Sequence, residues 1–256
     1  MNEQGPARRD YSELADAFGQ PHVASQLQQV AAGAYAAAAP FWRTAHTASA
    51  LSPRMTELVL VALHGTISSL NSDALRRHVS RALEAGATHA EVLDVLLTIA
   101  PIGNHALYFA VPVLMRELDA LDHPDAQLPP ITPEAQSVKE EFMRVRGFWN
   151  DKRDAIARAM PEYFVALSNM SMQTWAQGAL AEKERELVCI AIDCTVTHMF
   201  EEGLAMHIRH ALAKGATRDE ILAVFQLASV TGLEGFVIGA EALFPQPPAV
   251  PVPPRP

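Results

Sequence analysis

Three features that are scarce in this sequence exclude whole classes of protein. Cysteine occurs at only two of 256 positions, Cys189 and Cys194, a spacing that fits neither a disulfide framework nor a Cys-x-x-Cys redox pair. We therefore expect a reducing, cytoplasmic setting. Aromatic residues make up only 7% of the sequence. The net charge is −9, and the sequence contains no block of Lys or Arg residues. Nucleic acid and anionic membranes are therefore not expected partners.

Long apolar runs are scarce as well. No continuous run approaches the roughly 20 residues of a membrane-spanning helix, and the opening stretch, MNEQGPARRD, does not lead into the apolar core of a secretory signal. What the sequence has in abundance is alanine and leucine, within an apolar content of 49%. This composition favours a helical protein with a substantial core.

A phrase that occurs twice organises the chain. RHVSRALEAGAT occupies residues 77–88 and MHIRHALAKGAT residues 206–217, an offset of 129 residues that brings His78 onto His207. At this offset 16 of the 48 positions from Leu51 to Thr98 are identical to those of the second copy. So high an identity indicates a duplicated module rather than a short-period solenoid.

Each copy predicts three consecutive helices. The apolar stretches TELVLVALHGTISSL and RELVCIAIDCTVTHM have no turn signals and are too long for strands, so each predicts a buried helix. The histidine helix that follows ends at a glycine, which tolerates the left-handed conformation of a helix end. A Thr-x-x-Glu capping box then starts the third helix. These positions are Gly86, Thr88 and Glu91 in the first copy and Gly215, Thr217 and Glu220 in the second.

The composition between and after the copies suggests domain boundaries. The segment LDHPDAQLPPITPE is polar and proline-rich, as linkers are. We therefore expect an N-terminal domain at 1–120, a linker at 121–133 and a C-terminal domain at 134–244. The proline-rich tail at 245–256 can form neither a helix nor a central strand, and predicts a flexible end or an extended arm on a neighbouring subunit.

Acid–base residues are concentrated in the second copy. Both copies keep one glutamate, Glu57 or Glu186, and one histidine, His78 or His207, and each of these alone is more often structural than catalytic. The second copy adds His198 and Glu201 within HMFEEGLAMH, where the first has SLNSDALRRH. A histidine beside a carboxylate suits proton transfer near neutral pH, so this asymmetry favours a site in the second copy.

Two further readings of these residues stay open. The first takes His198, Glu201 and His207 as the ligands of a metal ion: His-x-x-Glu places two ligands on one helix face, whereas the gap to His207 fits no standard zinc spacing. His105 falls opposite Glu234 in the alignment of the copies. If the copies pack about a pseudo-twofold axis, either residue can face the cluster of the other copy, although a plain loop histidine is the commoner case.

The motifs RELVCIAID, VTHMFEEG and MHIRHALAKGATRDEIL together resemble the carboxymuconolactone decarboxylase family, which shares its fold with the alkylhydroperoxidase AhpD. The resemblance covers about Pro40–Leu118 and Gly178–Leu243, and implies an all-α fold of two tandem domains related by a pseudo-twofold duplication. It also implies a homo-oligomer, often a trimer of two-domain chains. Thiol-based peroxide reduction is not expected, because no Cys-x-x-Cys lies on the histidine helix.

The resemblance implies a cofactor-independent lyase or isomerase for a small carboxylated, ring-derived or lactone metabolite. We expect His207 as general acid with His198 as its partner, and Glu186 and Glu201 as the groups that orient the imidazoles. The expected substrate-binding residues are Arg209, His105 and His78. The alternatives are the metal-dependent enzyme described above and a non-catalytic oligomeric binding protein.

Overall fold

The computed structural model of the protein describes residues 11, 13–47 and 50–245. The regular elements within these residues are all helical, which confirms the expected all-α class. In chain order they are η1 (Leu14–Ala17), α1 (Pro21–Val30), α2 (Ala32–Thr47), α3 (Pro53–Gly65), α4 (Ser72–Glu84), α5 (His89–Ile99), η2 (Ala100–Gly103), α6 (Asn104–Ala120), η3 (Pro124–Ala126), α7 (Pro133–Arg146), α8 (Lys152–Ala159), α9 (Pro161–Gln177), α10 (Glu182–Asp193), α11 (Glu201–Ala213), α12 (Arg218–Val230), η4 (Thr231–Leu233) and α13 (Glu234–Leu243), where η denotes a 3-10 helix.

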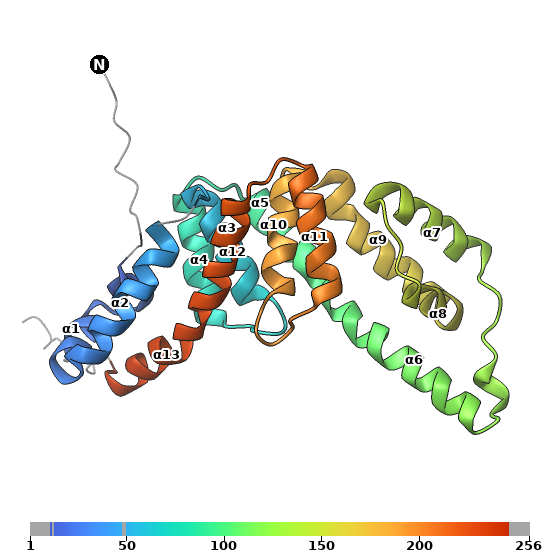
Figure 1. Ribbon diagram of the computed structural model, residues 1–256, viewed down its shortest axis with the longest axis horizontal. Helices are drawn as coiled ribbons and strands as arrows, with labels where there is room; N and C mark the ends of the chain where they lie inside the picture. Colours follow the sequence, from blue (N-terminus) through green and yellow to red (C-terminus); the bar gives the residue numbers. More distant parts are fainter. Residues whose placement is uncertain (1–10, 12, 48–49, 246–256) are drawn as a thin grey trace, which may run out of the picture.

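The helices form a central bundle with one arm on each side (Figure 1). The bundle contains α3, α4 and α5 of the first half and α10, α11 and α12 of the second. One arm contains α1, α2 and α13, and the other contains α6, α7, α8 and α9. Each arm therefore combines helices from both halves, because α13 crosses to α1 and α2 while α6 crosses to α7, α8 and α9.

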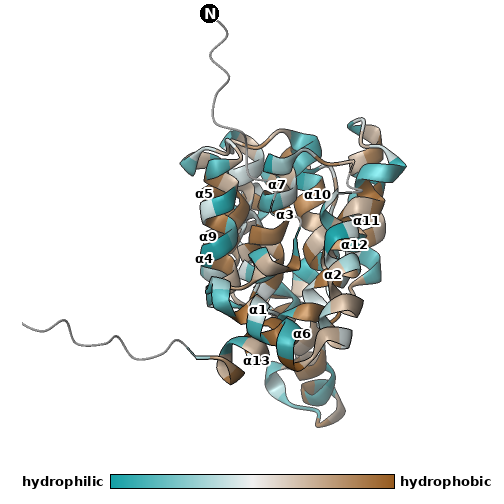
Figure 2. Cartoon of the chain, turned by 90° about the vertical axis from the view of Figure 1, so that its left-hand side faces the viewer, coloured by the Kyte–Doolittle hydropathy of each residue, from teal (hydrophilic) through white to brown (hydrophobic). Residues whose placement is uncertain are grey.

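Helices α3 and α10 pack against each other at the centre of the bundle and are buried on nearly all sides. A helix that is apolar all round belongs in such a core, and Figure 2 shows apolar residues on both helices. The expected buried helices are thus confirmed, but each is shorter than its apolar run. The rest of the run forms a turn that ends with a positive φ, 36° at Leu70 and 43° at Met199.

The predicted helix stops and starts are confirmed in both halves. Gly86 has a φ of 95°, and Thr88 Oγ1 accepts the N–H of Glu91 at 3.2 Å while the Glu91 carboxylate accepts the N–H of Thr88 at 2.7 Å. The second half repeats this reciprocal pair of bonds at Thr217, after Gly215 with a φ of 85°. Local sequence alone therefore determines these two junctions.

The structural correspondence of the halves extends further upstream than the sequence match. Helices α4 and α11 begin and end at equivalent positions at the 129-residue offset, and α2 begins at the position equivalent to the start of α9. Helix α2 packs against α12 and α9 packs against α5, so contacts cross the predicted domain boundaries, and the domain limits stay a prediction. Within the expected linker the chain forms η3, and residues 246–256 of the proline-rich tail lie outside the described part.

A buried ion pair joins the two halves. Asp94 of α5 accepts a hydrogen bond from Arg185 Nη2 of α10 at 2.6 Å and another from the Leu180 N–H at 2.8 Å. The side chains of Asp94 and Arg185 are 4% and 2% exposed. The positions equivalent to Arg185 and Asp94 in the other half are Thr56 and Ala223, so this pair is not part of the duplication.

Two helical stretches, His89–Ala120 and Arg218–Leu243, are apolar and long enough to cross a membrane by length and composition. This departs from the expectation that no stretch would qualify, because each stretch joins two helices through a 3-10 turn. Their residues contribute to the three hydrophobic cores of the bundle and arms. Core helices of soluble proteins can have the same length and apolar composition, so the two stretches are weak evidence for a membrane span.

Candidate active site

Each half buries one glutamate–histidine pair between its first two bundle helices. His78 Nδ1 lies 2.7 Å from Glu57 Oε2, and His207 Nδ1 lies 2.6 Å from Glu186 Oε2. The histidine kept at the same place in both copies thus has the same structural partner in both. The pairs differ in solvent exposure: the His78 side chain is 0% exposed, whereas the His207 side chain is 10% exposed.

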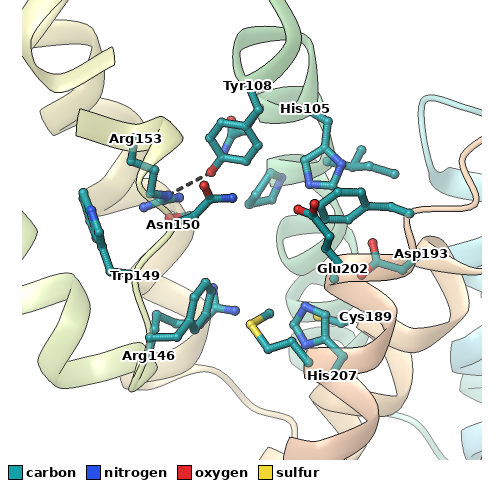
Figure 3. Close-up of a pocket in the computed structure, with 18 of the residues that line it drawn as sticks. His105, Tyr108, Arg146, Trp149, Asn150, Arg153, Cys189, Asp193, Glu202 and His207 are labelled. Atoms are coloured by element: carbon teal, nitrogen blue, oxygen red, sulfur yellow. Dashed lines mark hydrogen bonds between the residues drawn. The ribbon is translucent and has the colours of Figure 1, made fainter. Parts of the chain in front are cut away.

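His207 faces a cavity of about 670 Å³ between the bundle and the α6–α9 arm. Figure 3 shows two facing walls, one from the end of α7 and the start of α8 and the other from α10 and α11, with α6 closing one end. The first wall carries Arg146, Trp149, Asn150 and Arg153, the second carries Cys189, Asp193, Glu202 and His207, and α6 supplies His105 and Tyr108. Both halves of the chain therefore contribute to one cavity.

Two stacked arginines make the first wall cationic. The Arg146 guanidinium lies 3.8 Å from the ring centroid of Trp175, and that of Arg153 lies 3.8 Å from the ring centroid of Phe142. Burial lowers the pKa of Arg146 to about 10, which still leaves it charged at neutral pH. Within the described residues, Arg146 Nε and Arg153 Nη1 are buried without a hydrogen-bond partner. Unpaired buried donors of this kind favour an anionic ligand.

On the facing wall, His207 is arranged to carry a proton. The Glu186 carboxylate holds Nδ1, which leaves Nε2 as the second nitrogen for exchange. Burial lowers the pKa of His207, and the hydrogen bond to Glu186 offsets part of that effect. Trp175 stacks at 6.5 Å from His207, and His210 Nδ1 lies 3.4 Å from the other oxygen of Glu186. The hydrogen bond to Glu186 therefore fixes the orientation of the imidazole.

Asp193 is a buried carboxyl group at the end of α10. Burial raises its pKa to about 7, so a large fraction is protonated at neutral pH. It lies against Gly203, where an added Cβ would collide with Asp193 Oδ2 and with the Phe200 ring. The glycine of the motif HMFEEG is thus required because Asp193 and Phe200 approach its backbone closely. It lets α11 start directly beside this carboxyl group.

His105 of α6 reaches the site from the first half, one of the two arrangements that the pseudo-twofold alignment left open. Its Nδ1 lies 2.8 Å from His198 Nε2, and burial followed by the nearby His198 lowers the pKa of His105 to about 4. His198 does not line the cavity itself but lies directly behind His105, and its Nε2 is 3.8 Å from Asp193 Oδ1. These three side chains form a continuous polar group beside the cavity.

Glu201 and His78, two of the expected site residues, do not line the cavity. His207 and Arg209 line the cavity, but Glu201 does not, and its neighbour Glu202 does so instead, with Lys152 Nζ at 3.7 Å. His78 lies sealed in the first half and does not line this cavity. The expected orienting role of Glu201 and the substrate contact of His78 therefore need correction, because one side chain projects outward from the first turn of α11 and the other is enclosed.

The alternative metal set of His198, Glu201 and His207 is not brought together either. Among the described residues, the group whose ligand atoms approach closely enough for a shared ion is a different one, in the first half. Glu201 is exposed at the start of α11, whereas His207 is committed to Glu186 two turns further on. The metal-dependent reading based on these three residues is therefore wrong.

Neither cysteine resembles a reactive thiol. Burial raises the pKa of Cys189 far above its ordinary value and that of Cys194 to about 11. Cys189 lines the cavity from α10 and is enclosed among neighbouring side chains, and Cys194 donates to the carbonyl of Ala191 at 3.3 Å. Reactive cysteines need a lowered pKa, so these thiols act as packing groups.

Sequence reasoning missed the cationic wall and Asp193. Arg146, Trp149 and Arg153 lie in RVRGFWNDKR, which precedes the duplicated segment and matches no part of the first copy. The alternation of arginine and aromatic residues there was a usable signal, because such side chains stack to hold guanidinium groups in place. Asp193 was visible as an ionisable residue within an otherwise apolar stretch.

Two comparisons with known proteins bear on this site. Residues 161–238 match the model of the Carboxymuconolactone decarboxylase family, a segment that includes Glu186 and His207. Among solved structures, a candidate gamma-carboxymuconolactone decarboxylase subunit from Burkholderia xenovorans LB400 is similar over 93% of this chain and 97% of its own, with 29% identity and a TM-score of 0.80. None of the curated proteins matches the chain. The resemblance carried by the sequence motifs is thereby confirmed.

Proposed function

From the place of this chain in the carboxymuconolactone decarboxylase family, we propose that it is a cofactor-independent lyase or isomerase of a small carboxylated, ring-derived or lactone metabolite. The observation that carries the proposal is the Glu186–His207 pair facing the stacked Arg146 across one cavity (Figure 3). A proton carrier opposite a fixed cation suits reactions that pass through an enolate.

Substrate binding depends on the arginine wall in this proposal. Arg146 and Arg153 both line the cavity, and a carboxylate or enolate oxygen can accept hydrogen bonds from the guanidinium N–H groups that face it. Stacking on Trp175 and Phe142 fixes the two guanidinium planes, so little side-chain entropy is lost on binding. The cavity volume of about 670 Å³ is in the range of small-molecule sites.

The chemical step is a carbon–carbon cleavage followed by protonation. The bond between the leaving carboxylate and its carbon breaks, the electron pair remains as an enolate, and CO2 departs. The arginines stabilise the enolate oxygen. A protonated His207 then donates from Nε2 to the carbon, and solvent returns the proton. In an isomerisation the same nitrogen first removes a proton from one carbon and returns it to another.

The group formed by His105, His198 and Asp193 would supply protons from outside the cavity. His105 lines the cavity, whereas the His198 side chain is 16% exposed, and the two rings are hydrogen bonded. A neutral imidazole can accept a proton on one nitrogen and release one from the other. His198 therefore acts behind His105 in this proposal, rather than in direct contact with the substrate.

The first experiment follows CO2 release from γ-carboxymuconolactone, the substrate class that the family and the related structure suggest. Replacing His207 by Gln removes the proton carrier and is expected to lower kcat roughly 100- to 10,000-fold. Arg146→Met is expected to raise KM more than it lowers kcat. Glu117→Gln, on the exposed side of α6, is the matched control. Activity that survives His207→Gln contradicts the assignment.

A binding experiment separates the enzyme from a non-catalytic binding protein. Trp149 and Trp175 line the cavity, so a bound carboxylate should change their fluorescence, whereas Trp42 is buried in the other arm and serves as an internal reference. Saturable quenching that Arg146→Met abolishes, without turnover of any lactone acid tested, would favour the binding protein. Quenching together with turnover supports the enzyme.

We also propose that the protein is a cytoplasmic homo-oligomer, as the family resemblance suggested. Exposed apolar side chains on the arms support this, with Phe109 and Leu114 on α6 and Ile238 on α13 being 76%, 56% and 50% exposed. Light scattering gives the assembly mass, and replacement of Phe109 by Ser is expected to lower it. A monomer for the unmodified chain would contradict this proposal.

A further inference from the structure

A cluster of imidazole and carboxylate groups that the proposed reaction does not use lies around His78 of the first half, with one member, Glu234, supplied by the second half. His64 of α3, His78 of α4 and Glu234 of α13 each direct one ligand atom into a common space, and these three atoms lie within 4.8 Å of one another. The side chains of His64, His78 and Glu234 are 2%, 0% and 12% exposed. Two imidazoles and one carboxylate are a frequent ligand set for divalent first-row transition ions.

His78 is prepared as a ligand on one nitrogen. Its Nδ1 lies 2.7 Å from Glu57, while its Nε2 is fully buried with no hydrogen-bond partner in the described residues. A carboxylate that binds one ring nitrogen fixes the tautomer and raises the basicity of the other, as is usual behind metal-bound histidines. A buried acceptor without a partner costs free energy, and an ion would supply the missing contact.

The other two ligands are held in place around the same space. The rings of His64 and His78 are parallel within 4°, with centroids 5.0 Å apart, and His64 Nε2 lies 3.6 Å from Glu234 Oε1. Arg77 Nη2 and Asn71 Nδ2 each donate to Glu234 at 3.0 Å, one to each oxygen. The carboxylate is thus fixed by two neighbours and keeps lone pairs available for an ion.

We propose that His64, His78 and Glu234 bind one divalent transition-metal ion, with zinc favoured by the ligand set. Zinc lies about 2.0–2.2 Å from nitrogen and oxygen ligands, so small inward shifts of the three side chains complete the site. Because the ligands come from α3, α4 and α13, the ion would tie the arm of α1, α2 and α13 to the bundle.

The second half shows why this site belongs to the first half. The positions equivalent to His64, His78 and Glu234 are Asp193, His207 and His105, again two imidazoles and a carboxylate. There the groups line the large open cavity, and they do not form a close cluster of ligand atoms among the described residues. The proposed ion site is thus the closed counterpart of the proposed active site.

The test uses the full chain purified without an affinity tag. Elemental analysis after dialysis should find one zinc ion per chain, and cobalt(II) added to chelator-treated protein should give the absorption bands of a nitrogen- and oxygen-ligated ion. Glu57→Gln should weaken binding about 10- to 100-fold, as loss of a group behind a ligand does. Added zinc should raise the midpoint of thermal unfolding.

Variants in equivalent positions make the result specific. Glu234→Gln keeps a side-chain oxygen for Asn71 but removes the charged ligand, and is expected to abolish stoichiometric binding. His207→Ala, the matched change in the other half, should keep the full metal content. Because His78→Ala could prevent folding, His64→Asn, checked by circular dichroism, is the second ligand variant. Absence of zinc and of cobalt bands in the unmodified protein, or equal metal content in Glu234→Gln, would overturn the proposal.

Discussion

The two halves of the chain place the same glutamate–histidine pair on the same helices, yet one pair is sealed and the other faces a cavity. In the first half Arg77 forms an ion pair with Glu234, whose carboxylate lies close to the buried His78. Met206 and His105 occupy the equivalent positions in the second half and form no ion pair there. Loss of one charged bridge therefore accompanies the opening of the second site. The duplication therefore supplies the glutamate–histidine pair in both halves, and the residues around each pair determine whether the histidine is accessible.

The arms add a second difference between the halves. Arg146 and Arg153, the cationic wall of the cavity, fall at Ala17 and Ala24 in the first half. Both alanines are buried in the apolar core of that arm. The equivalent positions thus belong to a packed apolar core in one arm and to a cationic cavity wall in the other. This contrast is what directs the substrate to the second half in our proposal.

The largest predicted effect concerns the ion pair that the duplication does not repeat. Asp94→Ala leaves Arg185 buried without its partner, so the free energy of unfolding should fall by about 3–5 kcal/mol. Urea unfolding followed by circular dichroism measures this. The control is Glu141→Ala, which breaks an exposed pair with Arg144 and should leave the midpoint unchanged. Equal losses in both variants would refute the linking role of Asp94.

A smaller effect is expected where the two halves differ by one methyl group. Gly203→Ala places a Cβ against Asp193 and Phe200, and overpacking of this kind costs about 1–3 kcal/mol. The equivalent residue in the first half is Ala74, which is fully buried without difficulty. Thermal unfolding should therefore show a loss for Gly203→Ala, although alanine normally stabilises a helix relative to glycine. A gain in stability would contradict the close approach.

The third predicted effect is a change in the pH dependence of stability. Burial raises the pKa of Asp193 to about 7, so between its ordinary pKa of 3.8 and pH 7 the folded state holds a proton that the unfolded state releases. Stability should therefore fall as the pH rises through this window. Asp193→Asn should flatten that fall by at most about 1.4 kcal/mol per pH unit. Urea unfolding at pH 4 to 7 tests it, with the exposed Asp73→Asn as control, and an unchanged profile for Asp193→Asn contradicts the shift.

Sequence reasoning succeeded where the determinants are local. The capping boxes at Thr88 and Thr217 and the left-handed glycines need only neighbouring residues, and the structure has them as expected. The pairing of Glu186 with His207 was also predictable, because the duplication preserved both residues at a fixed spacing. These features required no knowledge of how the arms dock.

Sequence reasoning failed where the packing of the helices against one another determines which residues face the cavity. Glu201 and Glu202 are adjacent in the first turn of α11, and one residue corresponds to about 100° of rotation around the helix. Which of them faces the cavity depends on how α11 packs against α10 and on the position of Lys152. Arg146 likewise reaches the site through the crossing of the α6–α9 arm, which the linear order of the two copies does not reveal.

The central claim is that the chain binds a carboxylate between the arginine wall and His207, and none at the equivalent His78. A crystal structure with cis,cis-muconate, a small dicarboxylate, tests it most directly. Our account predicts one carboxylate on Arg146 and Arg153, with ligand carbon beside His207 Nε2, and none beside His78. Ligand bound elsewhere, or an empty cavity at saturating concentration, would contradict it.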